Sequence, residues 1–201
     1  MKASSELTWH ILKRAIDKIQ PGMRESEIVS LIRSLFEDYK IDRIWHPPYV
    51  RFGKHTLLQF HQGAQEDLIL QQEDIAFIDI GIVKNGVEGD AGQTFTFGGN
   101  PDYSAIQKAA EKIFQESREY WQQHNPTGIE LYGHIIKLTE AKGYHFNLEP
   151  AGHLIGAYPH RGWRKGINTF PETISPGHWI LEIQICHPTL PFGSFYESLL
   201  I

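Results

Sequence analysis

Four carboxylates of this chain lie in two matching arrangements, each of which begins with an apolar run. Asp79 and Glu182 each lie in the middle of a run of isoleucines and other apolar residues. A second extended stretch follows each of these runs and carries Asp90 or Glu197. An ionised carboxylate in an apolar strand costs several kcal/mol unless a cation or a full set of hydrogen bonds compensates it. Two matched pairs of this kind therefore suggest that the four side chains converge on metal.

The period of a β-strand explains how these side chains meet. Alternate residues of a strand point to the same face, so a hairpin places Asp79 beside Asp90, and a second hairpin does the same for Glu182 and Glu197. Without a cation, burial and mutual repulsion should raise the pKa values of such carboxyl groups. Carboxylates joined by imidazole, without the thiolates of a structural zinc site, suit borderline divalent ions such as Mn, Co, Fe or Zn.

The imidazole is expected from the segment between Pro150 and His160. His153 has glycines close on both sides, which allow a tight approach of the backbone, and His160 follows seven residues later. An isolated histidine is more often structural than a ligand, but this setting favours a ligand role for His153. His46, directly before two prolines, is expected to be structural or to form part of a pocket wall.

Helical periodicity predicts two pairs of helices, each followed by β-rich sequence. The predicted helices cover roughly residues 7–19, 28–39, 106–121 and 131–138. The first predicted hairpin links residues 76–83 to 90–97. Residues 1–98 and 101–201 therefore look like two copies of one arrangement, and we expect residues 1–201 to form a single pseudo-symmetric α+β domain.

The bulk composition excludes several classes of protein. The net charge of −5 gives no electrostatic reason to expect nucleic acid or an anionic membrane as a partner. The first residues lack the apolar core of a signal peptide, and no stretch approaches the roughly 18 apolar residues of a membrane span. A single cysteine, Cys186, excludes an internal disulfide and fits a reducing compartment. We therefore expect a cytoplasmic protein.

The ordered set Asp79, Asp90, His153, Glu182 and Glu197 resembles the metal ligands of the pita-bread metallopeptidases, which include methionine aminopeptidase, aminopeptidase P, prolidase and creatinase. The resemblance covers nearly the whole chain and implies two pairs of helices over a curved, mostly antiparallel sheet with pseudo-two-fold symmetry. It also implies two bound divalent metal ions. The short span from His153 to Glu182 looks most like aminopeptidase P and prolidase, whose N-terminal domain we expect to be missing here.

The resemblance also implies a role for each ligand. Asp90 and Glu197 would bridge the two ions, Asp79 would complete the first set of ligands, and His153 and Glu182 would complete the second. The ions would activate a water molecule for attack on a peptide carbonyl. Glu182 would also transfer a proton to the leaving amine.

The substrate-binding residues are expected from the segments that flank these ligands. His61 and His160 would steady the scissile carbonyl. Aromatic contact with a proline ring is expected from Tyr158, Trp163 and Phe192. The cations that would meet a carboxylate terminus are Arg161, Arg164 and Lys165. These residues would suit a site for short peptides of the Xaa-Pro type.

Several positions depart from the pattern of the family. Gly92 stands where the family often has threonine, Leu154 stands where it often has glycine, and Phe195 stands where aminopeptidase P has arginine. The ligands are retained, but the substrate preference does not transfer cleanly.

Four functions are therefore kept open. The first is a metal-dependent aminopeptidase or dipeptidase acting on short Xaa-Pro peptides. The others are a methionine aminopeptidase, a creatinase-like enzyme acting on a small C–N compound, and a non-proteolytic binding module. The complete ligand set counts against the last two. A homodimer is compatible with the sequence.

Overall fold

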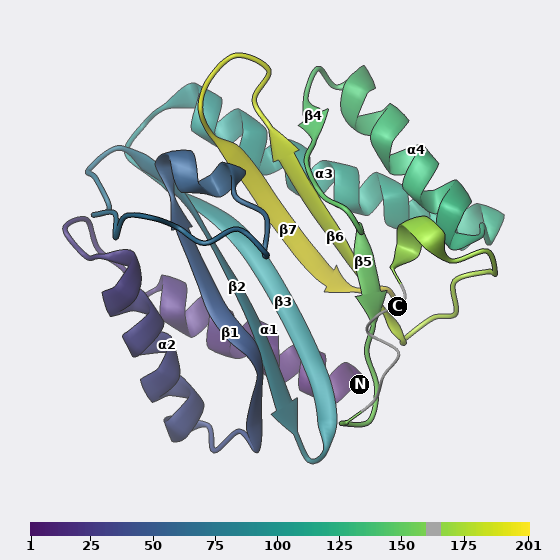
Figure 1. Cartoon of the computed structure of the whole chain (residues 1–201), viewed down its shortest axis with the longest axis horizontal. Helices are drawn as coiled ribbons and strands as arrows, with labels where there is room; N and C mark the ends of the chain where they lie inside the picture. The colour runs from purple at the N-terminus through teal and green to yellow at the C-terminus, as the bar shows by residue number, and fades with distance from the viewer. Residues whose placement is uncertain (160–165) are drawn as a thin grey trace.

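The computed structural model of the protein describes residues 1–159 and 166–201, and the helices of this part come in two pairs (Figure 1). Within these residues, the α-helices are α1 (Lys2–Ile16), α2 (Glu25–Asp38), α3 (Pro101–His124) and α4 (Gly128–Ala141). None of the described helices combines the length and the apolar character that crossing a membrane requires.

The strands form one sheet in the order β1-β2-β3-β7-β6-β4, and β5 also pairs with β6. Their bounds are β1 (Arg43–Phe52), β2 (Asp74–Lys84), β3 (Val87–Phe97), β4 (His145–Phe146), β5 (Gly152–Leu154), β6 (Trp179–Cys186) and β7 (Gly193–Leu199). The described pairings are antiparallel. The two halves of the chain join in the middle of the sheet, where β3 pairs with β7.

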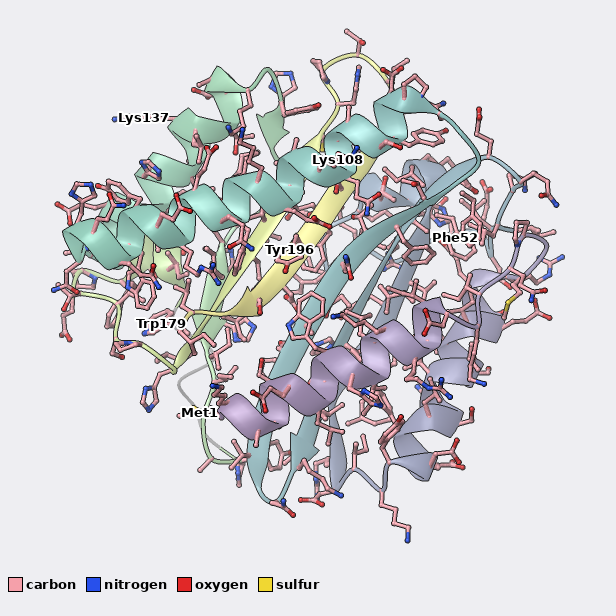
Figure 2. All side chains as sticks on the ribbon, turned by 180° about the vertical axis from the view of Figure 1, so that it is seen from behind. Met1, Phe52, Lys108, Lys137, Trp179 and Tyr196 are labelled. Carbon is pink, nitrogen blue, oxygen red and sulfur yellow. The ribbon has the colours of Figure 1, made fainter. Side chains whose placement is uncertain are left out.

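Helices α1 and α3 lie across one face of the sheet, as the view from behind shows (Figure 2). Ile78 and Ile80 of β2 are fully buried in the core that the first half forms with α1 and α2. Ile183 of β6 is buried in the corresponding core of the second half. Because side chains alternate along a strand, the neighbouring residues Asp79 and Glu182 point to the opposite face of the sheet.

Tyr196 of β7 connects the two helix pairs (Figure 2). Its ring lies 5.5 Å from the ring of Trp9 in α1 and 4.9 Å from that of Phe114 in α3. Tyr196 therefore faces the helices, and its neighbours Phe195 and Glu197 face the other side.

A tight turn sets the register of the first hairpin. Asn85 and Gly86 connect β2 to β3 and both have positive φ angles, 52° and 69°, as a type I′ turn requires. This turn places Asp79 directly opposite Gly92, with Asp90 two residues away on the same face of β3. The Asn-Gly pair thus determines which carboxylates can meet.

The structure confirms the predicted α+β class, with two helix pairs over a mostly antiparallel sheet. Some boundaries differ. Helix α3 begins at Pro101, before the predicted start, because the side chain of Asn100 accepts hydrogen bonds from the N–H groups of Asp102 and Tyr103. Strand β1 was not predicted at all. It contains the Pro47-Pro48 pair, and two consecutive prolines normally argue against a strand.

Candidate metal centre

Three of the predicted ligands lie in one row across the sheet. Tyr49, Asp79, Gly92, Glu197 and Glu182 are successive cross-strand neighbours on β1, β2, β3, β7 and β6. Directly opposite residues of antiparallel strands have Cβ atoms about 4.5–5.5 Å apart. Glu182 therefore faces Glu197, and Asp79 and Glu197 flank a position that has no side chain.

Asp90 lies between two imidazole rings. Its Oδ1 atom is 3.1 Å from Nε2 of His46, and its Oδ2 atom is 3.3 Å from Nε2 of His153. The same nitrogen of His153 lies 3.5 Å from Oε1 of Glu182. The Asp90 side chain is only 2% exposed, so the two histidines are its main compensation for burial. The five residues predicted as ligands are thus brought together on one face of the sheet.

The five predicted ligands and His46 form one cluster of side chains. Of these six residues, His46 is the one that was not predicted as a ligand. Its Nε2 atom is also 3.4 Å from Oδ1 of Asp79. It lies on β1, the edge strand, where the register with β2 shifts both before His46, after Ile44, and behind it, across Pro47 and Pro48. Bulges of this kind turn a side chain out of the regular alternation and are common next to active sites. The sequence feature that could have pointed to His46 is the Trp-His-Pro-Pro segment, because prolines favour an extended backbone.

Burial and repulsion raise the pKa values of three of the carboxyl groups. Burial raises the pKa of Asp79 to about 6, with a further increase from Asp90. Burial and the charge of Asp79 raise the pKa of Glu182 to about 8, and the pKa of Glu197 rises well above its usual value for the same reasons. These three groups behave as the sequence predicted for carboxylates without a bound cation.

The prediction was wrong for Asp90. Burial alone would raise the pKa of Asp90, but the two imidazoles against its oxygens hold that pKa below its ordinary value. For the two histidines, burial alone would have the opposite effect and lower their pKa values. The carboxylates of Asp79 and Asp90 instead raise the pKa of His46 to about 10, and those of Asp90 and Glu182 raise the pKa of His153 to about 9.

The donor set fits a divalent cation. Among the described residues, Oε1 of Glu197 is a buried oxygen without a hydrogen-bond partner, and Oδ1 of Asp79 has no hydrogen bond beyond its 3.4 Å contact with Nε2 of His46. A buried polar atom left without a partner costs about 1–3 kcal/mol, which a bound cation would remove. Carboxylate oxygens and neutral imidazole nitrogens are the donors that Mn, Co, Fe and Zn accept.

A narrow pocket opens beside the cluster and is lined mainly by aromatic and aliphatic side chains. Asp79 and Glu182 of the cluster line it. The rest of the wall comes from Tyr49, Arg51, Leu58, Gln59, Phe60, Phe77, Leu148, Gln184 and Phe195. A mostly apolar pocket with a few convergent polar groups is the usual form of a small-molecule site.

The predicted substrate-binding residues have different positions. His61 is exposed on the loop after pocket-lining Phe60, with the two rings 5.3 Å apart. The ring of Tyr158 lies under the guanidinium of Arg43, 5.3 Å away, and does not line the pocket. Phe192 was assigned wrongly, because it is buried in the core of the second half with its ring 4.8 Å from that of Tyr103.

The remaining predictions fall on residues 160–165, which lie outside the described part of the chain. These residues include His160, Arg161, Trp163, Arg164 and Lys165. Their proposed roles stay predictions.

The chain belongs to metallopeptidase family M24, which it matches over residues 1–193. The resemblance that the five predicted ligands suggested is thereby confirmed at the level of the family.

The sequence comparison finds methionine aminopeptidase 2 from several yeasts. The protein from Candida dubliniensis is 28% identical over 144 residues, which are 69% of this chain and 29% of that protein. The protein from Candida albicans (strain SC5314) is 26% identical over 144 residues, which are 69% of this chain and 30% of that protein. The chain therefore spans less than a third of the length of these curated relatives.

Solved structures share the fold. A prolidase from Pyrococcus furiosus has a TM-score of 0.81 at 20% identity, with 98% of this chain and 58% of that one covered. An X-Pro aminopeptidase from Thermotoga maritima has a TM-score of 0.79 at 21% identity, with coverages of 98% and 55%. A methionine aminopeptidase from Thermotoga maritima has a TM-score of 0.74 at 14% identity, with coverages of 98% and 89%. At these identities the likeness concerns the fold and not the substrate.

Proposed function

We propose that the protein is a metal-dependent aminopeptidase or dipeptidase that hydrolyses the N-terminal bond of short peptides, with a preference for proline after the scissile bond. One observation carries the proposal. Two imidazoles and the carboxylates of Asp79, Asp90 and Glu182 approach one another at 3.1–3.5 Å, and Asp79 and Glu182 of this group also line a narrow, mostly apolar pocket.

The residues of the cluster would hold two divalent ions. Asp79, Asp90, His153, Glu182 and Glu197 supply the oxygen and nitrogen donors that such ions need. Two ions bound there would activate a water molecule for attack on the peptide carbonyl. When metal is bound, the carboxyl groups therefore have to be ionised and the imidazole of His153 has to be neutral, because only then do their lone pairs serve as ligands.

Glu182 is well placed to move a proton during hydrolysis. Its side chain, like that of Asp79, is 14% exposed and lines the pocket in which a substrate would lie, whereas that of Asp90 is 2% exposed. In our proposal, Glu182 takes the proton of the attacking water and passes it to the leaving nitrogen. General acid–base catalysis of this type typically contributes about 10²–10⁴-fold to the rate.

The pocket wall supports a preference for proline. The nitrogen of an Xaa-Pro bond carries no hydrogen, so such a site has to recognise the ring by its shape and by apolar contact. Phe77 and Phe195, whose rings are 5.1 Å apart, and Leu148 form one cluster on this wall. Arg51, stacked 5.5 Å over Tyr49, offers a cation for the carboxylate end of a short peptide.

Methionine aminopeptidase is the second candidate. The specific observation in its favour is the sequence similarity to methionine aminopeptidase 2 of Candida species. An apolar pocket lined by phenylalanine and leucine would also accept a methionine side chain.

Matched peptides separate the two candidates. The protein, loaded in turn with Mn, Co, Fe or Zn, would be assayed on Ala-Pro-Ala, Ala-Ala-Ala and Met-Ala-Ala. We expect Ala-Pro-Ala to be cleaved at least about ten times faster than either other peptide, which corresponds to about 1.4 kcal/mol in the transition state. The variant Glu182→Gln would show that the activity belongs to this site. Equal or faster cleavage of Met-Ala-Ala would favour methionine aminopeptidase, and no cleavage by the metal-loaded protein would favour a binding module.

A further inference from the structure

We propose that His46 is a direct metal ligand, which binds through Nε2 the ion held by Asp79 and Asp90. The resemblance supplies five ligands, so His46 would be a sixth and would give each half of the chain one imidazole at the site. This inference rests on the proposed metal-dependent function and extends it to the composition of one of the two metal sites.

The distances are those of donors around one ion. Nε2 of His46 is 3.1 Å from Oδ1 of Asp90 and 3.4 Å from Oδ1 of Asp79, and one donor atom from each of these three residues lies within 4.8 Å of the others. Donors that are each about 2.1 Å from a metal ion are about 3.0 Å apart at a right angle and about 3.4 Å apart at the tetrahedral angle. An ion can therefore enter between these atoms with little movement of the side chains.

The backbone fixes which nitrogen of His46 faces the carboxylates. Nδ1 lies 2.9 Å from the carbonyl oxygen of Pro47. A carbonyl oxygen only accepts hydrogen bonds, so Nδ1 has to carry the proton, and the lone pair of the neutral ring is on Nε2. His153 has the same arrangement, with Nδ1 3.0 Å from the carbonyl oxygen of Leu154. Histidine ligands of metals typically donate their second N–H group in this way.

The neighbouring residues make room for the ring and hold it. Gly81 is directly opposite His46, and a Cβ atom at position 81 would come within 2.5 Å of Nε2 and would also clash with Cδ2. Trp45 packs against both His46 and His153, at 5.4 and 4.9 Å between ring centroids, and Tyr49 stacks on His46 at 5.6 Å. The imidazole is thus positioned before any ion binds, which favours a ligand over a mobile side chain.

A ligand role predicts a change in metal preference. Imidazole suits Co, Zn and Fe better than it suits Mn, for which carboxylate oxygens are the preferred donors. If His46 instead serves only as a positive counter-ion for Asp79 and Asp90, its removal should affect all divalent ions alike.

The test compares metal binding by the wild type, His46→Gln and a control, His145→Gln. His145 is an exposed histidine on β4, and the control removes one imidazole without touching the cluster. Metal-free proteins would be titrated with Co²⁺ and with Mn²⁺ by calorimetry, and the visible spectrum of bound Co²⁺ would be recorded. We expect His46→Gln to lower the affinity of one site for Co²⁺ by about 10–100-fold or more. Loss of a residue that only hydrogen-bonds to a metal ligand already lowers metal affinity by this amount. The Co²⁺ spectrum should change, Mn²⁺ affinity should fall less, and the control should match the wild type.

A second variant covers the case in which His46→Gln fails to fold. Gly81→Ala keeps the imidazole but occupies its space, so it should weaken the same Co²⁺ site and change the same spectrum. Wild-type Co²⁺ affinities and an unchanged spectrum in a folded His46→Gln or Gly81→Ala variant would overturn the ligand role, while peptide cleavage by the wild type would leave the proposed function standing. A wild-type protein that binds neither ion would overturn both.

Discussion

The ring of Phe195 occupies the space in front of Gly92. A Cβ atom at position 92 would clash with Cε1 of Phe195, would lie 2.8 Å from its Cδ1 atom and 3.1 Å from Cγ of Glu197. Gly92 and Phe195 are both departures from the family pattern. The structure connects them, because the missing side chain at Gly92 leaves the space that the ring of Phe195 fills in the pocket wall.

This relationship predicts a dependence between the two positions. Gly92→Thr restores the residue often found in the family and should reduce the free energy of unfolding by about 1–3 kcal/mol, because it overpacks a filled site. In a Phe195→Leu background the same substitution should cost at most half as much, since the ring is gone. Urea unfolding of the four proteins in chelator would measure the coupling. Equal costs in both backgrounds would contradict the relationship.

Much of the site could be predicted because its residues are marked locally. Asp79 interrupts an apolar run, Asp90 lies in the next extended stretch, and the Asn85-Gly86 turn between them sets the register. His153 stands between glycines. These signals are read within a few residues of the chain, so they do not require knowledge of the tertiary structure.

The parts that were missed depend on contacts between distant segments. His46 becomes a neighbour of Asp90 only because β1 pairs with β2, and two prolines hide that strand. Phe192 was expected at the substrate, but an aromatic residue in a turn does not reveal which side it packs on. It is buried against Tyr103 of α3.

Glu182 should be needed for turnover more than for folding. Glu182→Gln keeps the size of the side chain but removes a base and one negative ligand, so the rate should fall by about 10²–10⁴-fold while thermal unfolding changes little. Asp90→Asn should lower metal occupancy more than Glu182→Gln does, because Asp90 is the proposed bridge between the ions. Elemental analysis and peptide assays of both variants would measure this. Wild-type metal content and turnover in both would refute the assignment of the two ligands.

The stability of the metal-free protein should fall as the pH rises from about 6 to about 9. Between pH 4.5 and about 8, folded Glu182 keeps a proton that the unfolded chain releases, so its contribution declines as pH increases. The pKa values of His46 and His153 are raised from 6.5 to about 10 and about 9. Their contributions to stability therefore also decline as the pH rises above 6.5. Asp90, whose pKa is lowered, contributes above pH 3.8 and loses that contribution only at lower pH.

Thermal unfolding at pH 6, 7.5 and 9 in chelator would measure this dependence. A saturating divalent ion should flatten it, because the ion takes over the role of the protons. His46→Gln should also reduce the slope, and His145→Gln should not. A melting temperature that stays level or rises towards pH 9 without metal would show that the cluster does not carry these charges.

A buried hydrogen-bonded pair, Glu25 and His55, should support the segment that leads into the pocket. Glu25, the first residue of α2, accepts hydrogen bonds from the backbone N–H of Phe52, at 2.8 Å, and from Nδ1 of His55, at 3.0 Å. The two side chains are only 7% and 6% exposed. Glu25→Ala should therefore reduce the free energy of unfolding by about 1–3 kcal/mol for each of the two donors that lose their acceptor in a buried place. Glu25→Gln should cost less, since its amide oxygen still accepts a hydrogen bond from Phe52.

An exposed ion pair next to this segment provides the control. Lys54 and Glu66 form an ion pair at 3.1 Å, with side chains that are 55% and 61% exposed. Lys54→Ala should change the free energy of unfolding by less than about 1 kcal/mol. Urea unfolding would compare the three variants, and a cost of Glu25→Ala no larger than that of Lys54→Ala would refute the role of the buried pair. Leu58 and Gln59 line the pocket and follow closely after His55, the hydrogen-bond partner of Glu25. The KM for peptide should therefore rise in Glu25→Gln even when this variant is fully folded.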